Sequence, residues 1–253
     1  MTTVKQYHLE PFLYKVNAQV KEIVAKGVIL DKTISFAEGG GQIGDSGTII
    51  NQKTNKQYHY TDTTKVPGRV LHLSDFPTIT VENDIIHHIE DQYLTEFEVG
   101  DQCEIVIDLE KRQNISFNHT AIHIALMAAE KIRPQLRKSI YGAKINDNYG
   151  RLDFKLDSRF SVDEMEKIND YANEIIKQEL DIKIFAHLEE EEALYWECGD
   201  FVIPCGGTHA INTKQLGEII VRRKNIGKSA DRLIATFNLE DIPLDMYYEQ
   251  SNI

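Results

Sequence analysis

The segment that organises this chain is Pro204-Cys205-Gly206-Gly207-Thr208-His209. Its Cys205 and His209 are four residues apart, and the two glycines between them favour a tight loop over a helix. A second pair, His119 and His123, has the same spacing and would lie on one face of a helix, one turn apart. A thiolate and three imidazoles form a ligand set that zinc accepts at four tetrahedral corners. We therefore expect one metal site, with two ligands from a helix and two from a loop.

Either pair taken alone has a simpler explanation. The chain holds 9 histidines, and a half-buried helix can carry core histidines that bond only to their neighbours. The combination of thiolate and imidazole favours a metal site, because zinc prefers these ligands. Position 120 is Thr rather than Glu, so the general base of the HExxH metalloproteases is missing and a peptidase is disfavoured.

The composition is that of an ordinary globular protein, with 253 residues, 42% hydrophobic and 27% charged. This length allows one large domain or two ordinary ones. The three cysteines, Cys103, Cys198 and Cys205, are too few for a disulfide framework, which favours a reducing cytoplasm. The first ten residues show no signal-peptide pattern, and no apolar run reaches eighteen residues. We expect neither a secreted nor a membrane protein.

Charge is unevenly distributed along the chain. The formal net charge of -12 opposes a polyanionic partner such as nucleic acid. Basic residues nevertheless gather between Lys131 and Lys155 and again between Arg222 and Arg232, whereas acid gathers in Glu189–Glu192. Each basic cluster is either a solvated face or a contact surface for phosphates.

The first half of the chain has the pattern of β-structure, with short alternating or apolar runs separated by turn residues. No helical periodicity interrupts them, which predicts a small closed β-barrel over residues 1–109. The expected strands are Val16–Val20, Gly27–Leu30, Tyr58–Thr61, Arg69–Leu73 and Gln102–Asp108.

A glycine-rich motif lies inside this half: Phe36-Ala37-Glu38-Gly39-Gly40-Gly41-Gln42-Ile43-Gly44-Asp45-Ser46-Gly47. It lacks the Gly-Lys-Ser/Thr of a P-loop and the spacing of a dinucleotide fingerprint. It is either a hairpin loop or a backbone that approaches a ligand closely. In the second case Gln42 is the side chain of interest, since its amide both donates and accepts.

The second half, residues 110–253, mixes helices with strands and predicts an α+β sandwich. Asn118 is expected to cap a helix that ends near Pro134. Ser161-Val162-Asp163-Glu164 is a capping box that opens a second helix, extending to about Leu180. Expected strands are Ile145–Leu156, Asp181–Ala186, Phe201–Ile203, Leu216–Arg222 and Arg232–Phe237, with Glu189–Glu192 as a solvated helical turn.

These motifs together resemble those of the AlaX family, free-standing relatives of the editing domain of alanyl-tRNA synthetase. The glycine-rich motif, His119–His123 as HxxxH and Cys205–His209 as CxxxH occur in the family's order. The resemblance covers nearly the whole chain and indicates the longer type, with an N-terminal barrel. Ala37 and Ile43 stand where the family usually has Pro, a difference expected to alter loop stiffness more than chemistry. The synthetase's aminoacylation region is absent, so we do not expect a synthetase.

The resemblance implies hydrolysis, in trans and without ATP, of the ester that joins a wrong amino acid to tRNA-Ala. It implies one Zn²⁺ per chain held by His119, His123, Cys205 and His209. Gln42, His119 and Cys205 are the candidate catalytic residues, and the family pattern places Gln42 near the aminoacyl end. The candidate substrate contacts are Gly40, Gly41, Gln42, Thr120 and Thr208; for both threonine hydroxyls, bonding to nearby backbone is the simpler use. Charge alone suggests tRNA contacts at Arg137, Lys138, Arg222 and Arg223.

Several alternatives stay open. Four protein ligands would close the coordination sphere, whereas catalytic zinc keeps one position open. The metal would therefore either be held by three of the residues or only orient the substrate. Editing of another tRNA, as by the threonyl synthetase's domain, and a non-catalytic zinc-stabilised tRNA-binding module are the competing functions. The sequence does not indicate whether the enzyme would prefer a seryl or a glycyl ester.

Overall fold

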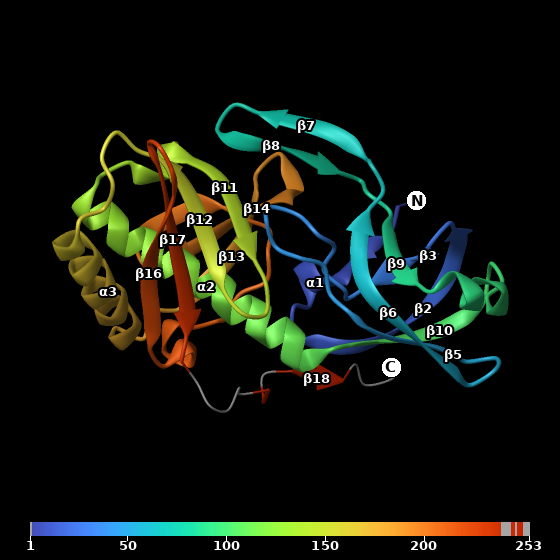
Figure 1. The fold of residues 1–253 in the computed structure, drawn as a ribbon. Coiled ribbons are helices and arrows are strands. Elements are labelled where there is room, and N and C mark those ends of the chain that lie inside the picture. Colours follow the sequence, from blue (N-terminus) through green and yellow to red (C-terminus); the bar gives the residue numbers. More distant parts are fainter. Residues whose placement is uncertain (1, 239–243, 246, 250–253) are drawn as a thin grey trace. The chain divides into compact units, whose positions relative to one another are not determined.

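The computed structural model describes residues 2–238, 244, 245 and 247–249. They form two compact units, each built from several segments (Figure 1). The first unit contains the described residues of Met1–Gly39, Ile43–Arg112 and Leu244–Ile253, and the second contains those of Gly40–Gln42 and Gln113–Pro243. Three residues of the glycine-rich motif therefore belong to the second unit. Among the described residues, the helices are all too short or too polar to span a membrane.

The first unit is a β-barrel of six antiparallel strands. Its order is β2-β3-β9-β6-β5-β10, and β10 pairs back onto β2 to close it. Alternating side chains fill the interior, among them Val16, Ile49, Tyr60 and Ile105. The six strands are β2 (Leu13–Val24), β3 (Gly27–Leu30), β5 (Gly47–Asn51), β6 (Lys56–Lys65), β9 (Ile85–Ile89) and β10 (Gln102–Ile107).

One predicted barrel strand lies elsewhere. Arg69–Leu73 forms β7, but in the described part of the chain it pairs with β8 (Phe76–Val81) alone, in a separate two-stranded hairpin. All of its side chains are exposed or half-buried, so its alternation does not reflect a barrel interior. The remaining elements of this unit are β1 (Val4–Lys5), α1 (Gln6–Leu9), β4 (Lys32–Thr33), η1 (Asp91–Glu96) and β18 (Tyr248–Glu249).

An ion pair is buried within the first unit. Arg112 donates from Nε to both carboxylate oxygens of Asp45, at 3.1 and 3.0 Å, and from Nη2 to the carbonyl of Ile34 at 2.7 Å. Asp45 also accepts from the backbone N–H of Phe36 at 2.6 Å. Both charged side chains are at most 2% exposed. The carboxylate at the end of the glycine-rich motif therefore serves the packing of this unit.

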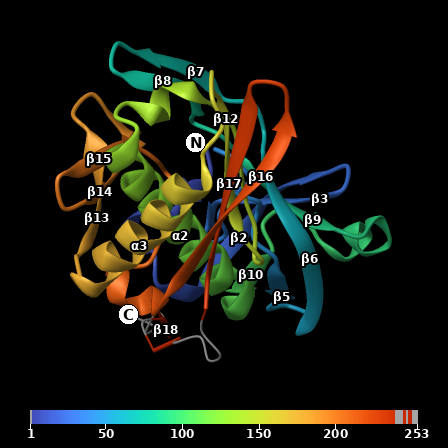
Figure 2. The same cartoon turned by 60° about the vertical axis from the view of Figure 1, so that its left-hand side comes forward.

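Two sheets, one complete long helix and a second long helix from Gln113 onward make up the second unit (Figure 2). The four-stranded sheet has the order β11-β12-β17-β16, and the three-stranded sheet has the order β13-β14-β15. The elements are α2 (Leu109–Ile132), η2 (Leu136–Ser139), β11 (Ile140–Ile145), β12 (Gly150–Lys155), α3 (Val162–Lys177), β13 (Ile182–His187), β14 (Glu190–Cys198), β15 (Phe201–Pro204), η3 (Thr213–Leu216), β16 (Ile219–Gly227) and β17 (Ala230–Phe237).

The helix that carries the histidine pair starts earlier than predicted. α2 begins at Leu109, and its first turn is capped by Asp108, whose carboxylate accepts from the backbone N–H of Lys111 at 3.0 Å. Asn118 is therefore a buried residue inside the helix and does not cap it. The predicted end before Pro134 is confirmed, since α2 ends at Ile132.

The capping box on α3 is confirmed, with Ser161 and Glu164 bonding each other's backbone N–H groups. The predicted helical turn at Glu189–Glu192 is wrong, because Glu190–Glu192 begin strand β14, where Glu190 pairs with His187 of β13. These glutamates alternate between exposed and half-buried positions along the strand. Their carboxylates can therefore reach water from a strand as well as from a helix. The predicted strand Ile145–Leu156 starts too early: the strand in this range is β12, from Gly150 to Lys155, and Ile145 is the last residue of β11, which the sequence pattern did not predict.

Candidate metal centre

Four potential ligands converge in the second unit. His119 and His123 lie on α2, and Cys205 and His209 lie on the loop after β15. Their donor atoms all lie within 4.8 Å of one another. The Cys205 sulfur is 3.5 Å from His119 Nε2 and 3.3 Å from His209 Nε2. In a tetrahedral zinc site, the ligand lengths put neighbouring donors about 3.3–3.6 Å apart, so these four residues fit a metal ion.

Backbone pairing fixes the position of the loop. The N–H of Cys205 donates to the carbonyl of Leu194 at 2.8 Å, which extends the pairing between β14 and β15 into the loop. Two residues further along β14, Trp196 is fully buried and stacks on His123, with ring centroids 4.9 Å apart. The three-stranded sheet therefore holds the loop and one helical ligand together.

The site is strongly desolvated. Burial, with a smaller contribution from neighbouring imidazoles, holds the pKa values of His119 and His209 well below the usual range. Burial also lowers the pKa of His123 to about 3. Among the described residues, neither ring nitrogen of His123 has a hydrogen-bond partner. Neutral imidazoles with free lone pairs are the form that binds a metal.

The thiol of Cys205 is also affected by burial, which raises its pKa to about 11, while a backbone hydrogen bond from Gly207 acts in the opposite direction. Without a cation at the site the thiol keeps its proton. A divalent ion displaces that proton, so binding and deprotonation are coupled.

Gln42 links the glycine-rich motif to the cluster. Its Oε1 accepts from His119 Nδ1 at 2.7 Å and from the backbone N–H of Thr208 at 3.0 Å, and its Nε2 donates to Thr208 Oγ1 at 3.0 Å. Because an amide oxygen only accepts, Nδ1 of His119 carries the proton and Nε2 presents its lone pair toward Cys205. A hydrogen bond of this kind orients metal-binding histidines.

Two glycines allow this close packing. Gly41 has φ +89, and a Cβ there would lie 2.8 Å from the carbonyl oxygen of Ala143. At Gly207 a Cβ would lie 2.3 Å from Cε1 of His119 and 2.6 Å from Oε1 of Gln42. Gly40, also at positive φ, has open space around it. Only glycine fits between the loop and the histidine at position 207.

The two threonines differ. Thr120 donates to the carbonyl of Ser116 at 2.9 Å and accepts from the backbone N–H of Ala210 at 3.0 Å. Its hydroxyl is occupied by backbone, so we do not include it in the proposed substrate contacts. Thr208 Oγ1 accepts from Gln42 and also from the hydroxyl of Ser116 at 2.8 Å, which leaves its own proton available to a ligand.

The predicted tRNA-contact residues separate into two groups. Arg137 bonds the carboxylate of Glu130 through Nε at 2.9 Å and the carbonyl of Val202 through Nη1 at 2.9 Å. Arg223 pairs with Asp231, which is fully buried, at 2.5 Å. Lys138 and Arg222 are exposed. The structure thus gives two of the four predicted cations internal carboxylate partners.

Sequence reasoning missed Ser116 and Trp196, which support Thr208 and His123 respectively. Ser116 lies one helical turn before Thr120, a spacing that would have placed it near the ligands once the helix start was known. For Trp196 no sequence signal was available, because its approach to His123 depends on how the three-stranded sheet pairs.

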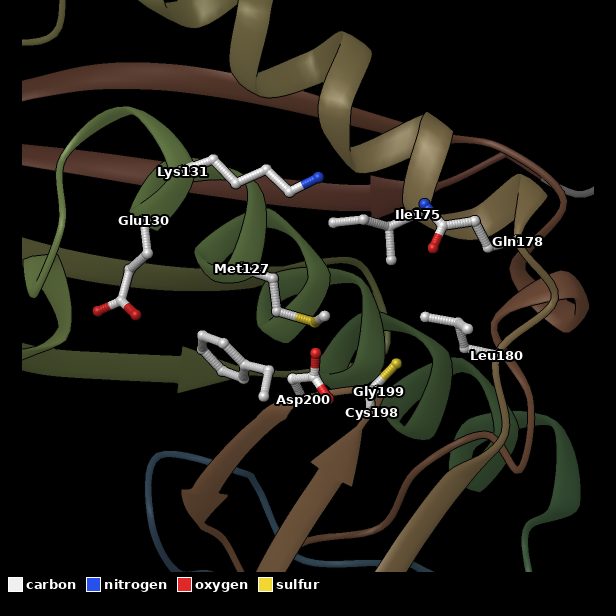
Figure 3. A pocket seen from close by; sticks show the side chains of 10 residues that line it. Met127, Glu130, Lys131, Ile175, Gln178, Leu180, Cys198, Gly199 and Asp200 are labelled. Carbon is white, nitrogen blue, oxygen red and sulfur yellow. The ribbon is translucent and has the colours of Figure 1, made fainter.

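A separate pocket of about 540 Å³ lies in the same unit (Figure 3). Met127, Ile175 and Leu180 contribute apolar side chains to its lining, and Glu130 lines it as well. None of the four potential ligands lines it. Phe201, another lining residue, has the guanidinium of Arg137 4.1 Å from its ring centroid. We assign it no part in the metal centre.

Comparisons with known proteins give consistent results. A model of class II (A) tRNA synthetases matches residues 10–93. The alanine–tRNA ligases of Saccharolobus islandicus and Sulfurisphaera tokodaii are each 30% identical to this chain, over 86% and 92% of it and over 24% and 25% of the ligase. The chain thus spans about a quarter of the length of these ligases. The alanyl-tRNA editing protein AlaX-M of Pyrococcus horikoshii is 28% identical over 91% of this chain and 96% of its own length.

Proposed function

This chain belongs to the AlaX family, and from that membership we propose that it hydrolyses mischarged tRNA-Ala in trans, with Ser-tRNA-Ala as substrate. The match along 96% of an alanyl-tRNA editing protein supports this proposal. The match to the ligases covers only about a quarter of their length, and the ligase activity is not part of the proposal. We further propose that residues 1–109 form a barrel domain and that residues 110–253 form an α/β-sandwich editing domain. We propose the cytoplasm as the location of the protein.

The chemical need for such an activity follows from recognition. A pocket for alanine excludes the smaller glycine poorly, and it excludes the added hydroxyl of serine only modestly. A second site that destroys the wrong ester after transfer supplies the missing accuracy. Ester hydrolysis passes through a negatively charged oxygen, which a desolvated site with fixed dipoles stabilises.

The observation that carries the proposal is the convergence of His119, His123, Cys205 and His209 with Gln42 bonded to His119. We propose that these four residues hold one Zn²⁺, since one thiolate and three imidazoles match its preferences. When bound, zinc supplies a positive charge that polarises the ester carbonyl or orients the substrate's amino group.

The chain's own groups have distinct proposed roles. Gln42 fixes the tautomer and the orientation of His119. Thr208 offers its hydroxyl proton to a polar group of the substrate, such as the serine hydroxyl. Gly40 and Gly41 keep the backbone beside Gln42 free of side chains, so that the aminoacyl end can approach.

The test is deacylation of Ser-tRNA-Ala, with Gly-tRNA-Ala and correctly charged Ala-tRNA-Ala in parallel. Wild type should release serine selectively, and Cys205→Ala should lose at least about 100-fold in rate, because it removes a metal ligand. Cys198→Ala is the matched control, since Cys198 is a buried thiol in β14 outside the ligand set. Stoichiometric zinc without hydrolysis of any of these esters would favour the binding-module alternative.

A further inference from the structure

The four-stranded sheet has one face that is strongly basic. Residues aligned across its four strands are Lys144 on β11, Arg151 on β12, Ile234 on β17 and Arg222 on β16. In the neighbouring row two residues away, Asp153, Arg232 and Lys224 are aligned. Because side chains alternate between the faces of a sheet, all of these lie on the same side.

The opposite face is the packed one. The intervening residues Leu152, Phe154, Leu233 and Ala235 are buried. Helix α3 lies against this side, where Asn173 donates to the carbonyl of β16 residue Ile219 at 2.9 Å (Figure 2). The basic side is therefore the outer face, defined here by Lys144, Arg151, Lys155, Arg222, Lys224 and Arg232.

This outer face holds six cations and one carboxylate. The carboxylate is Asp153, only 7% exposed, which accepts from Arg232 Nε at 2.6 Å and also pairs with Arg151. Burial raises the pKa of Asp153, but the hydrogen bonds and charges of the two arginines outweigh it and hold the pKa below its usual range. Six cations less one anion leave a formal charge of +5 on this face, in a chain whose net charge is -12.

The cations are also spaced for a polyanion. The row from Lys144 to Arg222 crosses three strand spacings, about 14 Å. Lys144, Lys155, Arg222 and Lys224 are exposed. Three of the row's four positions are cations and the other is Ile234. Since a nucleic-acid strand places phosphates about 3.4 Å apart along a helix axis, the row is as long as a run of about four phosphates. Acidic side chains cover no comparable part of the described four-stranded sheet.

The outer face reaches the metal centre at strand β11. Ile145, next to Lys144, donates its backbone N–H to the carbonyl of Gly41 at 2.7 Å and pairs with Gln42. Gln42 in turn contacts His119. One edge of the basic sheet is thus attached to the segment that supports the metal ligands.

We propose that the outer face binds the phosphate backbone of the tRNA acceptor arm, whose 3′ end then turns around the β11 edge toward the metal centre. This inference rests on the proposed function, in which the ester lies at that 3′ end. It keeps Arg222 as a tRNA contact. It drops Arg137, which lies in η2 outside this sheet, and Arg223, which points to the packed face and pairs there with Asp231.

The experiment measures binding of uncharged tRNA-Ala by fluorescence anisotropy over a range of salt concentrations. Uncharged tRNA makes the result independent of hydrolysis, so this inference and the proposed function can fail separately. The variant is Lys144→Glu with Arg222→Glu. The control is Lys167→Glu with Lys177→Glu, two exposed lysines on α3 that change the net charge by the same amount.

The outer-face variant should bind at least about tenfold more weakly, and its slope of log K against log salt should fall by about 2, roughly one per lost phosphate contact. The control should keep the wild-type slope. Equal losses in both variants, or an unchanged slope in the first, would overturn the inference, as would wild-type binding of polyglutamate in preference to tRNA. If the charge-reversal variant does not fold, the neutral variant Lys144→Gln with Arg222→Gln should show the same decrease in the slope of log K against log salt.

Discussion

Replacing Gly207 by Ala should damage the metal centre, whereas the same change at Gly206 should not. A Cβ at position 207 would lie 2.3 Å from Cε1 and 2.5 Å from Nδ1 of His119. At position 206 it would meet only Leu194, at 3.9 Å. Neither glycine requires a left-handed backbone, so the two substitutions differ in space and not in backbone conformation.

The magnitude follows from these distances. Ordinary van der Waals contact begins near 3.4 Å, so the imidazole of His119 would have to retreat by roughly 1 Å. Metal–ligand lengths tolerate only about 0.2 Å, and the retreat would also break the 2.7 Å hydrogen bond to Gln42. Loss of an outer hydrogen bond alone costs about 10–100-fold in metal affinity. We expect Gly207→Ala to weaken zinc binding by at least about 100-fold and Gly206→Ala by less than about threefold.

The assay is competition for Zn²⁺ against a chromophoric chelator, with thermal unfolding of both metal-free variants recorded beside it. Overpacking costs about 1–3 kcal/mol, so some loss of stability at Gly207→Ala is expected and is measured separately. If Gly207→Ala bound zinc as tightly as Gly206→Ala, the arrangement of loop and helix described above would be refuted.

Three further predictions concern single side chains. Asp45→Ala should destabilise by about 3–5 kcal/mol in urea unfolding, because it leaves the guanidinium of Arg112 buried without its partner; a loss below about 1 kcal/mol would contradict this. Burial lowers the pKa of His87 to about 4. As pH falls from 6.5 to 4, His87 is therefore protonated in the unfolded chain but stays neutral in the native state. The free energy of unfolding should fall by about 3 kcal/mol over this range. His87→Gln should remove that part of the pH dependence, and parallel curves for both proteins would argue against it. Gln42→Leu should weaken zinc binding by about 10–100-fold and Gln42→Glu by less, because a carboxylate still accepts from His119; equal losses would show that the acceptor is unimportant.

The sequence predicted that His119, His123, Cys205 and His209 converge, and the structure brings these four potential ligands together; the prediction was possible because the spacing within each pair is local. Cys205 and His209 are joined by glycines, and His119 and His123 are one helical turn apart, so spacing alone gathers each pair. Spacing alone does not show that the two pairs lie close together in space. Their proximity depends on the contact of Trp196 with His123 and on the pairing of β14 with β15.

The helix start was mispredicted for a physical reason. From Ile115 to Leu126 every residue of α2 is buried, so the helix has no solvated face and its sequence shows no clear 3.6-residue period. Without that period, Asn118 looked like a cap. Asp108, the actual cap, was assigned to the end of the preceding strand.

The sequence located the basic clusters, but it could not show which face of a strand each basic side chain occupies. Arg222 and Arg223 are neighbours in sequence and therefore point to opposite faces of β16, one to solvent and one to Asp231. A count of charges along the chain cannot make this distinction before the strand and its neighbours are known.

The contacts of Gln42 have a consequence for biosynthesis. The groups that meet around His119 come from positions as far apart as 42 and 209, and the bond from Gln42 to Thr208 spans 166 residues. In a zinc finger, a short segment closes on its ion by itself. Here a ribosome-bound chain cannot assemble the centre until four-fifths of it has emerged, and such non-local closure is slow. Metal uptake would therefore mark the completion of the native fold rather than its beginning.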